Sequence, residues 1–349
     1  MGRITDSTLF TLVHDFLKIY LPKQRNNSNH TIKAYRTSLE QLFDFVKKER
    51  NINLTQITFE ILNDGIITEY LDDLESSRGC SISTRNHRLK CIRSFYNYAA
   101  SMEPTTVIFQ MEMRKIPFKK SPTSESISFM SENAVKALLD QPDTKTKNGL
   151  RNQFLMILMY DTAARVQEIL NLQICDIHFG KTATATLLGK GNKVRTVPLM
   201  ERTVQHFKNY IAIFHPEADI FSKTPLFYVE RKGKVTTMSD DNIRKFMSEY
   251  GDAARLVCPD VPEKVYPHLW RHSRAMHLYQ HGMDLTLVSQ WLGHAHLETT
   301  MIYAHADTEL KRKAIEKATS VQSPLNDKSA VPRFDVNDDE VLKRLYGLK

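Results

Sequence analysis

The chain has 349 residues, 41% of them hydrophobic, and a formal net charge of +8. This length is enough for two domains that each bury a core, since a domain typically takes about 100–200 residues. No apolar run approaches the ~20 residues of a membrane-spanning helix, and residues 1–6 lack the apolar core of a secretion signal. The four cysteines form no C-x-x-C pair, which favours reduced, structural thiols. We therefore expect a cytoplasmic protein, and its basic excess weakly favours a polyanionic partner.

The first third of the chain is predicted to be helical. Apolar residues recur at helical spacing from Leu9 to Tyr20, and Pro22 is expected to end that helix. The polar run 27–30 offers caps for a second helix, and Ser81 and Ser83 offer caps for a later one. The four expected helices begin near residues 9, 31, 59 and 81. They predict a helical N-terminal domain over residues 1–113.

Basic side chains on the fourth helix and beyond it are candidate DNA contacts. Such charges usually face solvent on an ordinary amphipathic helix, but among aromatic residues they would also suit a helix lying on DNA phosphates. Residues 114–126 contain two prolines and four cationic residues, and they are predicted to form a linker that follows the DNA backbone or is a solvated tether. The candidate contacts in this part of the chain are Arg85, Arg88, Arg93, Lys119 and Lys120.

The second domain is predicted over residues 127–319. A nearly all-apolar run at 154–160 indicates a buried helix, and β-like segments flank the turn residues 189–192, which predicts a hairpin. Further elements are expected as strands at 226–230 and 234–238 and as helices at 239–257, 270–281, 284–292 and 307–318. The tail 320–349 contains a short amphipathic helix that either packs on its own domain or docks on a neighbouring subunit. The expected fold class is mainly α with a small antiparallel β-sheet.

Two arginines have the chemistry to stabilise attack on a phosphodiester. In-line attack builds extra negative charge on the phosphate oxygens, and a guanidinium offers permanently charged, paired donors for those oxygens. Arg165 and Arg271 are the candidates. Glu168 lies one helical turn after Arg165 and is expected to orient it, although an i,i+3 pair of this kind is by default only a surface ion pair.

Three cations lie in or after the predicted hairpin turn. Lys190 stands between two glycines, and a mobile lysine there could protonate a leaving 5′-oxygen. Lys193 and Arg195 then suit contacts with backbone phosphates. Solvent-facing hairpin charges remain a plausible alternative for all three.

Histidines recur downstream at helical spacing. His268 and His272 are four residues apart, a spacing that can also bind zinc. Arg271 lies between them and no acidic third ligand is near, so we expect no metal. His272 is expected to brace its helix, whereas His268 and His294 are catalytic candidates.

Tyr303 is the proposed nucleophile. A phenol with a pKa near 10 reacts poorly until its proton is removed, and His268, or a water that it holds, is the expected acceptor. Any one of the thirteen tyrosines is by default a core or surface residue, and Tyr303 is singled out by its place after His294.

The order of these residues resembles the tyrosine recombinase family, most closely its Xer-type and mobile-element integrase branch. Five ordered boxes are far more specific than one motif. The boxes are Ala164–Leu172, Gly189–Lys193, His268–His272, Leu292–His294 and Thr299–Tyr303. The resemblance is strong over residues 130–310 and looser over the N-terminal helices. Ala163-Ala164 replaces the family's usual Gly-Leu, and Trp270 stands where Leu is frequent.

The resemblance implies a site-specific enzyme that breaks and rejoins duplex DNA. Tyr303 would form a 3′-phosphotyrosyl bond, and strand exchange would pass through a Holliday junction without metal, ATP or another cofactor. A homotetramer would act on an inverted-repeat core site, while the free protein would be a monomer or weak dimer. A directionality factor, a role in integration or transposition of a mobile element, and a nucleoid-associated bacterial location are also implied.

Three other interpretations remain open. The chain could be a catalytically inactive DNA-binding protein of the same fold, or a type IB-like topoisomerase or resolvase. A zinc hydrolase using His268 and His272 is the third. A covalent intermediate would exclude the first, recombinant product would argue against the second, and resistance to a chelator would argue against the third.

Overall fold

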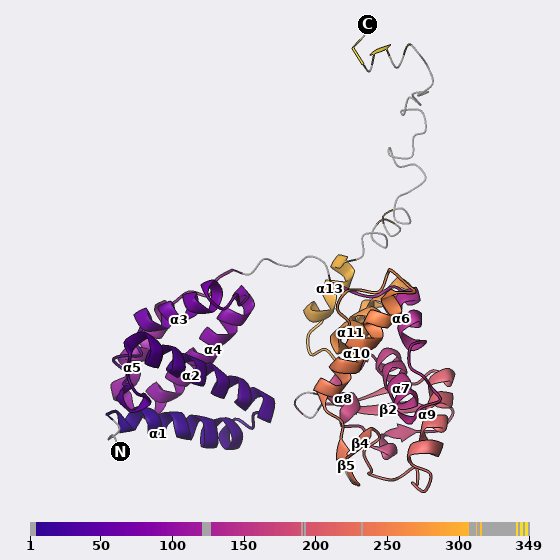
Figure 1. Cartoon of the computed structure of the whole chain (residues 1–349), viewed down its shortest axis with the longest axis horizontal. Coiled ribbons are helices and arrows are strands. Elements are labelled where there is room, and N and C mark those ends of the chain that lie inside the picture. Colours follow the sequence, from indigo (N-terminus) through magenta and orange to yellow (C-terminus); the bar gives the residue numbers. More distant parts are fainter. Residues whose placement is uncertain are drawn as a thin grey trace. The chain divides into compact units, whose positions relative to one another are not determined.

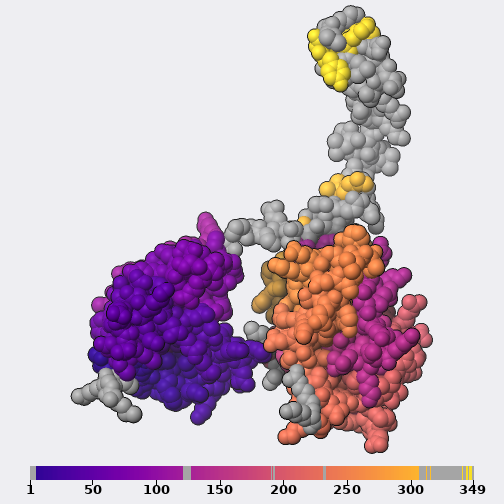
Figure 2. All heavy atoms as spheres, in the orientation of Figure 1, coloured from indigo at the N-terminus to yellow at the C-terminus, as the bar shows by residue number. Residues whose placement is uncertain are grey.

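The computed structural model describes residues 5–120, 127–189, 191, 193–231 and 233–306, together with isolated positions beyond 306. The chain divides between residues 123 and 124 into two compact units (Figures 1 and 2). Most of the structure is helical and the strands form two small antiparallel sheets, so the predicted fold class is confirmed. In the described part of the chain, no helix is both long and apolar enough to span a membrane.

The N-terminal unit is built from helices packed around an aromatic core. Its five α-helices are α1 (Ser7–Asp15), α2 (Asn29–Arg50), α3 (Asp64–Ser76), α4 (Ile82–Met102) and α5 (Val107–Lys115). The Ser28 and Ser81 side chains accept from the backbone amides of Thr31 and Thr84, so both predicted N-caps are confirmed. Phe16 makes an edge contact with Phe95, with ring centroids 5.6 Å apart.

Pro22 does not end the first helical segment. The chain continues from α1 into a π-helix, η1 (Phe16–Gln24), that contains Pro22, so the predicted end at this proline is wrong. Proline cannot donate the backbone hydrogen bond of an α-helix, whereas a π-type bulge changes the local bonding and accommodates the missing donor. Phe16 and Leu21 are buried in this segment, and their burial favours a continuous helix over a break.

The second unit places its catalytic candidates on helices around a three-stranded sheet. Its helices are α6 (Glu132–Leu139), α7 (Lys147–Thr162), α8 (Val166–Leu170), α9 (Glu201–Phe214), α10 (Asp240–Arg255), α11 (Pro267–Gln280), α12 (Leu285–Leu292) and α13 (Glu298–Ala306). The sequence did not predict α9. The helix expected at 307–318 and the tail helix lie largely outside the described residues.

The predicted hairpin is confirmed as a pair of antiparallel strands. The sheet has the order β1 (Ile177–His178), β2 (Thr184–Leu188) and β3 (Val194–Pro198), with Leu188 opposite Val194 next to the turn. A second hairpin joins β4 (Tyr228–Arg231) to β5 (Lys234–Thr237), as expected. Both hairpins pair strands that are adjacent in sequence, so the register follows directly from the turns.

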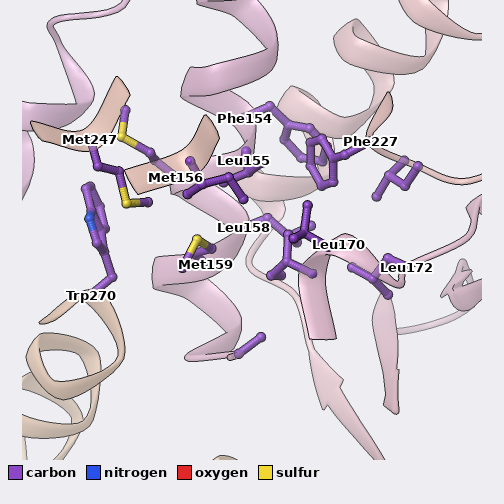
Figure 3. Close-up of a cluster of buried hydrophobic side chains, with 14 of the residues drawn as sticks. Phe154, Leu155, Met156, Leu158, Met159, Leu170, Leu172, Phe227, Met247 and Trp270 are labelled. Atoms are coloured by element: carbon purple, nitrogen blue, oxygen red, sulfur yellow. The ribbon is translucent and has the colours of Figure 1, made fainter. Parts of the chain in front are cut away.

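Helix α7 is the centre of this unit's core. Its residues Phe154, Leu155 and Leu158 are at most 1% exposed, which confirms the predicted buried helix. Figure 3 shows α7 side chains beside Phe227 and, in the same cluster, Trp270 of α11. Burying a large apolar side chain contributes about 1.5–3 kcal/mol. The core therefore fixes α7 and α11 relative to each other, and with them the residues at their ends.

Candidate active site

A cavity of about 330 Å³ gathers residues from three of the predicted boxes. Arg165 comes from the turn between α7 and α8, Gly189 from the end of β2, and His294 from the turn after α12. Lys193 and Arg195 line the same cavity. Segments that are far apart in sequence thus converge where the sequence places its cationic candidates.

Arg165 is held by its own helix start. It is the N-cap residue of α8, and its backbone amide donates to Glu168 Oε2 at 2.8 Å. The Arg165 guanidinium donates to Glu168 Oε1 at 2.9 Å. The contact predicted from the i,i+3 spacing is therefore present, but Glu168 is only 3% exposed, so this is no surface ion pair. Arg165 remains partly exposed and can present its other donors to the cavity.

Arg195 is bound to the same carboxylate. Its Nη1 and Nη2 donate to Glu168 Oε1 and Oε2 at 2.9 and 2.7 Å, and its Nε donates to the backbone carbonyl of Trp291 at 3.0 Å. Burial alone would raise the pKa of Glu168, but hydrogen bonds and charge from Arg195, with hydrogen bonds from Arg165, lower it below its ordinary value. These bonds use three of the five N–H donors of the Arg195 guanidinium, and its expected contact with a backbone phosphate stays a prediction.

Arg271 is almost completely buried. It is 4% exposed, and it donates to the backbone carbonyls of Ala163 at 2.7 Å and Leu292 at 2.6 Å. Burial, with the nearby charge of Arg165, lowers the pKa of Arg271 to about 9. These bonds tie the end of α7 to the end of α12 through one side chain of α11. The guanidinium is thereby fixed with no carboxylate partner in the described part of the chain, a state that favours an incoming anion.

Ala163 has a conformation that explains the family's usual glycine at this place. Its φ of 50° and ψ of 29° are left-handed, which costs a residue with a side chain about 1–2 kcal/mol. Its carbonyl accepts from Arg271, so the turn orients an acceptor for that side chain. Residues with such strain concentrate at functional sites.

Tyr303 lies beside His272. The Tyr303 hydroxyl and His272 Nδ1 are 2.9 Å apart, and Tyr303 is 1% exposed. Burial raises the pKa of Tyr303 to about 12, against the lowering effect of Arg271 and Arg165. Burial and the charges of His268 and Arg271 lower the pKa of His272, so it is neutral near pH 7. The structure thus brings His272, and not His268, to the tyrosine hydroxyl. The bracing role expected for His272 missed this contact.

The other two histidine candidates are His294 and His268. His294 Nδ1 lies 2.7 Å from the buried Thr300 hydroxyl on α13. Burial, followed by the charges of Arg271 and Arg165, lowers the pKa of His294 to about 4. The His268 ring centroid is 6.4 Å from that of His272, and burial and the same arginines lower the pKa of His268. The lowered pKa values favour the neutral form of all three imidazoles at pH 7.

The hairpin lysines are only partly described. Lys190 lies outside the described residues, but the glycine before it is fixed, because the Gly189 amide donates to the Lys193 carbonyl at 2.8 Å. Lys193 is exposed and lines the cavity, as a phosphate contact requires. A Cβ on Gly189 would stand 3.1 Å from Glu168 Oε1, which leaves little room for any other residue there.

Of the candidate DNA contacts in the N-terminal unit, the three arginines of α4 donate to groups of neighbouring segments. Arg85 is 3% exposed and donates to the Pro117 carbonyl at 3.0 Å, so the expectation that it contacts DNA is contradicted. Arg93 donates to the Met113 carbonyl at 2.9 Å, and Arg88 donates to the Ser38 hydroxyl at 3.0 Å. Both are partly buried and hold neighbouring helices together, and a DNA contact for either stays a prediction.

Residues 116–120 of the predicted linker pack on the N-terminal unit. Lys119 Nζ lies 2.6 Å from Glu75 Oε2, so its charge is already paired. The Arg93 guanidinium lies over the adjacent Phe118 ring, with Cζ 4.6 Å from the ring centroid. Lys120 is exposed, and residues 121–126 are outside the described part. Of the two expected linker lysines, Lys120 is the one left open to a DNA phosphate.

The described residues contain no cluster of three or more His, Cys, Asp or Glu side chains placed to hold a metal ion.

The fold and the converging arginines, histidines and tyrosine define a class of enzyme that breaks and rejoins DNA strands. The chain belongs to the phage integrase family, whose profile matches residues 128–309, and the N-terminal SAM-like domain of phage integrases matches residues 14–103. It is a tyrosine-type site-specific recombinase, as the five boxes predict.

Relatives and solved structures agree with this assignment. The chain is 30% identical over 310 residues to the tyrosine recombinase XerD of Staphylococcus epidermidis, covering 87% of this chain and 96% of that protein. Its fold is similar to that of the XerH site-specific recombinase bound to palindromic difH substrate in a post-cleavage complex. That match has a TM-score of 0.63 and 22% identity, and it covers 91% of this chain and 90% of the other. The Tn1549 transposon integrase in complex with transposon right end DNA gives a TM-score of 0.62 at 16% identity, over 86% and 98% of the two chains.

Proposed function

We propose that this recombinase cuts duplex DNA with Tyr303 and holds the broken strand as a 3′-phosphotyrosyl ester. The observation that carries the proposal is the 2.9 Å contact between the Tyr303 hydroxyl and His272 Nδ1. The positive charges of Arg271 and Arg165 act on the same hydroxyl and favour its anion. A nucleophile, a neutral proton acceptor and two phosphate-binding cations are thereby combined.

The reaction needs one bond made and one bond broken. The Tyr303 oxygen attacks the scissile phosphorus while its proton passes to a neutral histidine, and the bond from phosphorus to the 5′-oxygen breaks. Lys190 protonates that oxygen, and Arg165 and Arg271 bind the non-bridging oxygens. His294 donates to the same phosphate. A 5′-hydroxyl from a second duplex then reverses the step and joins the exchanged strands through a Holliday junction. Because the ester energy is retained in the phosphotyrosyl bond, the cycle needs no ATP, and the arginines take the place that a metal would fill.

His272 is the histidine best placed to accept the Tyr303 proton. It is within hydrogen-bond distance of the phenol, and burial keeps it neutral and therefore able to accept a proton. His268 is the acceptor that the motif favours, and it stays a candidate for a conformation in which DNA draws Tyr303 outward.

The assembly follows from the chemistry of exchange. Joining two duplexes requires four cleavages, so we propose a homotetramer on two inverted-repeat core sites, formed from monomers or weak dimers. The similarity to Xer recombinases and to a transposon integrase supports a role in dimer resolution or in integration and transposition of a mobile element. A directionality factor, a docking role for the tail and action at the bacterial nucleoid belong to the same proposal.

Covalent trapping tests the proposal. The protein is mixed with nicked duplexes cut from the DNA beside its own gene and resolved on denaturing gels. We expect an adduct that disappears in Tyr303→Phe and persists in EDTA. Loss of the adduct in EDTA would refute the metal-free mechanism, and an adduct in Tyr303→Phe would refute the nucleophile. Relaxed plasmid without recombinant product would favour the topoisomerase-like alternative. Tight binding without an adduct would favour a DNA-binding protein without strand-transfer activity.

A further inference from the structure

A second polar cavity lies at the far end of α7 from the catalytic candidates. Its volume is about 470 Å³, and its walls come from α7, α9, β4 and α10, which lie together in the second unit (Figure 1). Helix α7 rises about 1.5 Å per residue, so Arg151 in this cavity is roughly 16 Å along the helix from Thr162. None of the five described members of the proposed catalytic set lines it.

Arg151 is a buried cation with spare donors in this cavity. It is 9% exposed, and its Nε and Nη2 donate to Asn152 Oδ1 at 3.1 and 2.9 Å. Asn152 is fixed in turn, because its Nδ2 donates to the Tyr250 hydroxyl at 3.1 Å. A guanidinium has five N–H donors, so three are left without a partner among the described residues. The side chain is therefore held in one orientation with most of its hydrogen-bonding capacity open.

No carboxylate in the described part of the chain forms an ion pair with Arg151. Burial lowers the pKa of Arg151, and the groups that oppose this effect are the phenols of Tyr210 and Tyr250. Burying a charge without a counter-ion is costly, and proteins usually avoid it by pairing the charge. An anion in the cavity would supply the missing partner.

The surrounding side chains indicate which anion would bind. Lys147 lies one turn before Arg151 on the same face of α7, and Lys245 faces the cavity from α10. A planar fork flanked by two mobile ammonium groups suits the several oxygens of a phosphate. Glu230 and Glu249 line the same cavity and can accept hydrogen bonds from hydroxyl or amino groups of the ligand. The volume lies within the roughly 300–1,000 Å³ of small-molecule sites.

We propose that this cavity binds a small phosphomonoester of nucleotide size, with its phosphate on Arg151. The site is separate from the DNA-cleaving residues, and it uses the charge that the catalytic proposal leaves without a role. The remainder of the ligand lies between the aromatic wall of Phe214 and Phe246 and the two carboxylates. Free phosphate and the phosphates of a DNA backbone share the same recognition chemistry, and the experiment separates these sources.

Calorimetric titration of the full-length protein with AMP, ribose 5-phosphate, inorganic phosphate and adenosine tests this proposal. We expect AMP and ribose 5-phosphate to bind more tightly than phosphate, and adenosine to give no heat. Arg151→Met should weaken the affinity for AMP at least tenfold. Arg151→Lys keeps the charge but loses the planar, paired donors of the guanidinium, and it should weaken the affinity less. Equal affinity for AMP and adenosine would overturn the proposal, and so would an unchanged affinity in Arg151→Met.

A second variant and a competition experiment complete this test. If Arg151→Met does not fold, the double variant Lys147→Gln/Lys245→Gln, at exposed positions, should still weaken AMP binding several-fold. The control Lys208→Gln, on the exposed face of α9, should leave AMP binding unchanged. Equal affinities in these two variants would refute the site. A short duplex that displaces AMP in competition would assign the cavity to DNA phosphates and overturn the small-molecule proposal, whereas unchanged AMP binding supports it.

Discussion

Replacing Arg195 by methionine should destabilise the catalytic unit by about 3 kcal/mol. Methionine keeps most of the apolar stem but removes the paired bonds to Glu168 and the bond to the Trp291 carbonyl. Breaking a buried ion pair by removing one partner typically costs about 3–5 kcal/mol. Arg165 remains bound to Glu168, which moderates this loss, while the lost bond to the carbonyl adds about 1 kcal/mol.

Arg244→Met is the matched control. Arg244 also binds one carboxylate through two nitrogens, those of Asp240 at 3.1 and 2.8 Å, but the Arg244 side chain is 51% exposed. Its loss should cost about 0.5 kcal/mol or less. Equilibrium urea unfolding followed by tryptophan fluorescence is the assay, because both tryptophans, Trp270 and Trp291, belong to the catalytic unit.

The comparison has a clear negative outcome. If Arg195→Met and Arg244→Met lower the free energy of unfolding by equal amounts, the buried ion pair of Arg195 with Glu168 contributes no more than an exposed one. A cycle with Glu168→Gln sharpens the test, because both changes together should cost at least about 1 kcal/mol less than the sum of the single changes. Additive losses would mean that the two side chains do not depend on each other.

Three further predictions concern the same site. Gly293→Ala should lower the free energy of unfolding by more than about 2 kcal/mol in the same assay, because its φ is +64° and a Cβ would stand 2.9 Å from Arg195 Cδ. Gly282→Ala is the control and should cost about 1 kcal/mol, because its φ is +90° but no atom beyond its chain neighbours lies within 4 Å of the new Cβ. Equal losses in the two variants would disprove the clash. The pKa of His294 falls from 6.5 to about 4 on folding, so its contribution to stability is present above pH 6.5 and is lost as the pH falls toward 4. Urea unfolding across this range should show a loss of stability on the order of 2 kcal/mol, and this loss should be smaller in His294→Gln. The same dependence of unfolding free energy on pH in the variant would refute the assignment. Arg271→Lys cannot keep both bonds to the two backbone carbonyls, so covalent-adduct formation at saturating DNA should fall at least a hundredfold, and an unchanged rate would remove Arg271 from the proposed mechanism.

The sequence predicted those features that depend on local pattern. The caps at Ser28 and Ser81, the buried helix around residue 158 and the hairpin follow from spacing and turn chemistry over a few residues. The ordered boxes predicted which side chains converge, because a shared fold fixes their arrangement. The continuation of the first helical segment past Pro22 could not be foreseen, since a π-helix depends on the packing of Phe16 and Leu21.

The partners of individual side chains were not predictable from spacing. Arg195 binds Glu168, which is 27 residues away, and a backbone carbonyl 96 residues away, so only the folded chain brings them together. Its place in a basic run suggested a solvent-facing charge. The contact of His272 with Tyr303 spans 31 residues and depends on how α13 packs against α11. Sequence order thus predicted which residues form the candidate site, while the ion pairs within it depend on tertiary structure.

Burial disfavours the anion of the proposed nucleophile. Tyr303 is 1% exposed and its pKa is raised to about 12, so a phosphate cannot reach it, and the phenolate cannot form, without a change around α13. Burial, followed by the charges of Arg271 and Arg165, lowers the pKa values of His268 and His294 and favours their neutral forms. On the proposed mechanism, a scissile phosphate bound between Arg165 and Arg271 offsets the effect of these charges, which raises the histidine pKa values and makes the neutral imidazoles stronger acceptors for the Tyr303 proton. On this proposal the charge of the substrate promotes removal of the tyrosine proton, so Tyr303 becomes reactive only where a phosphodiester is bound.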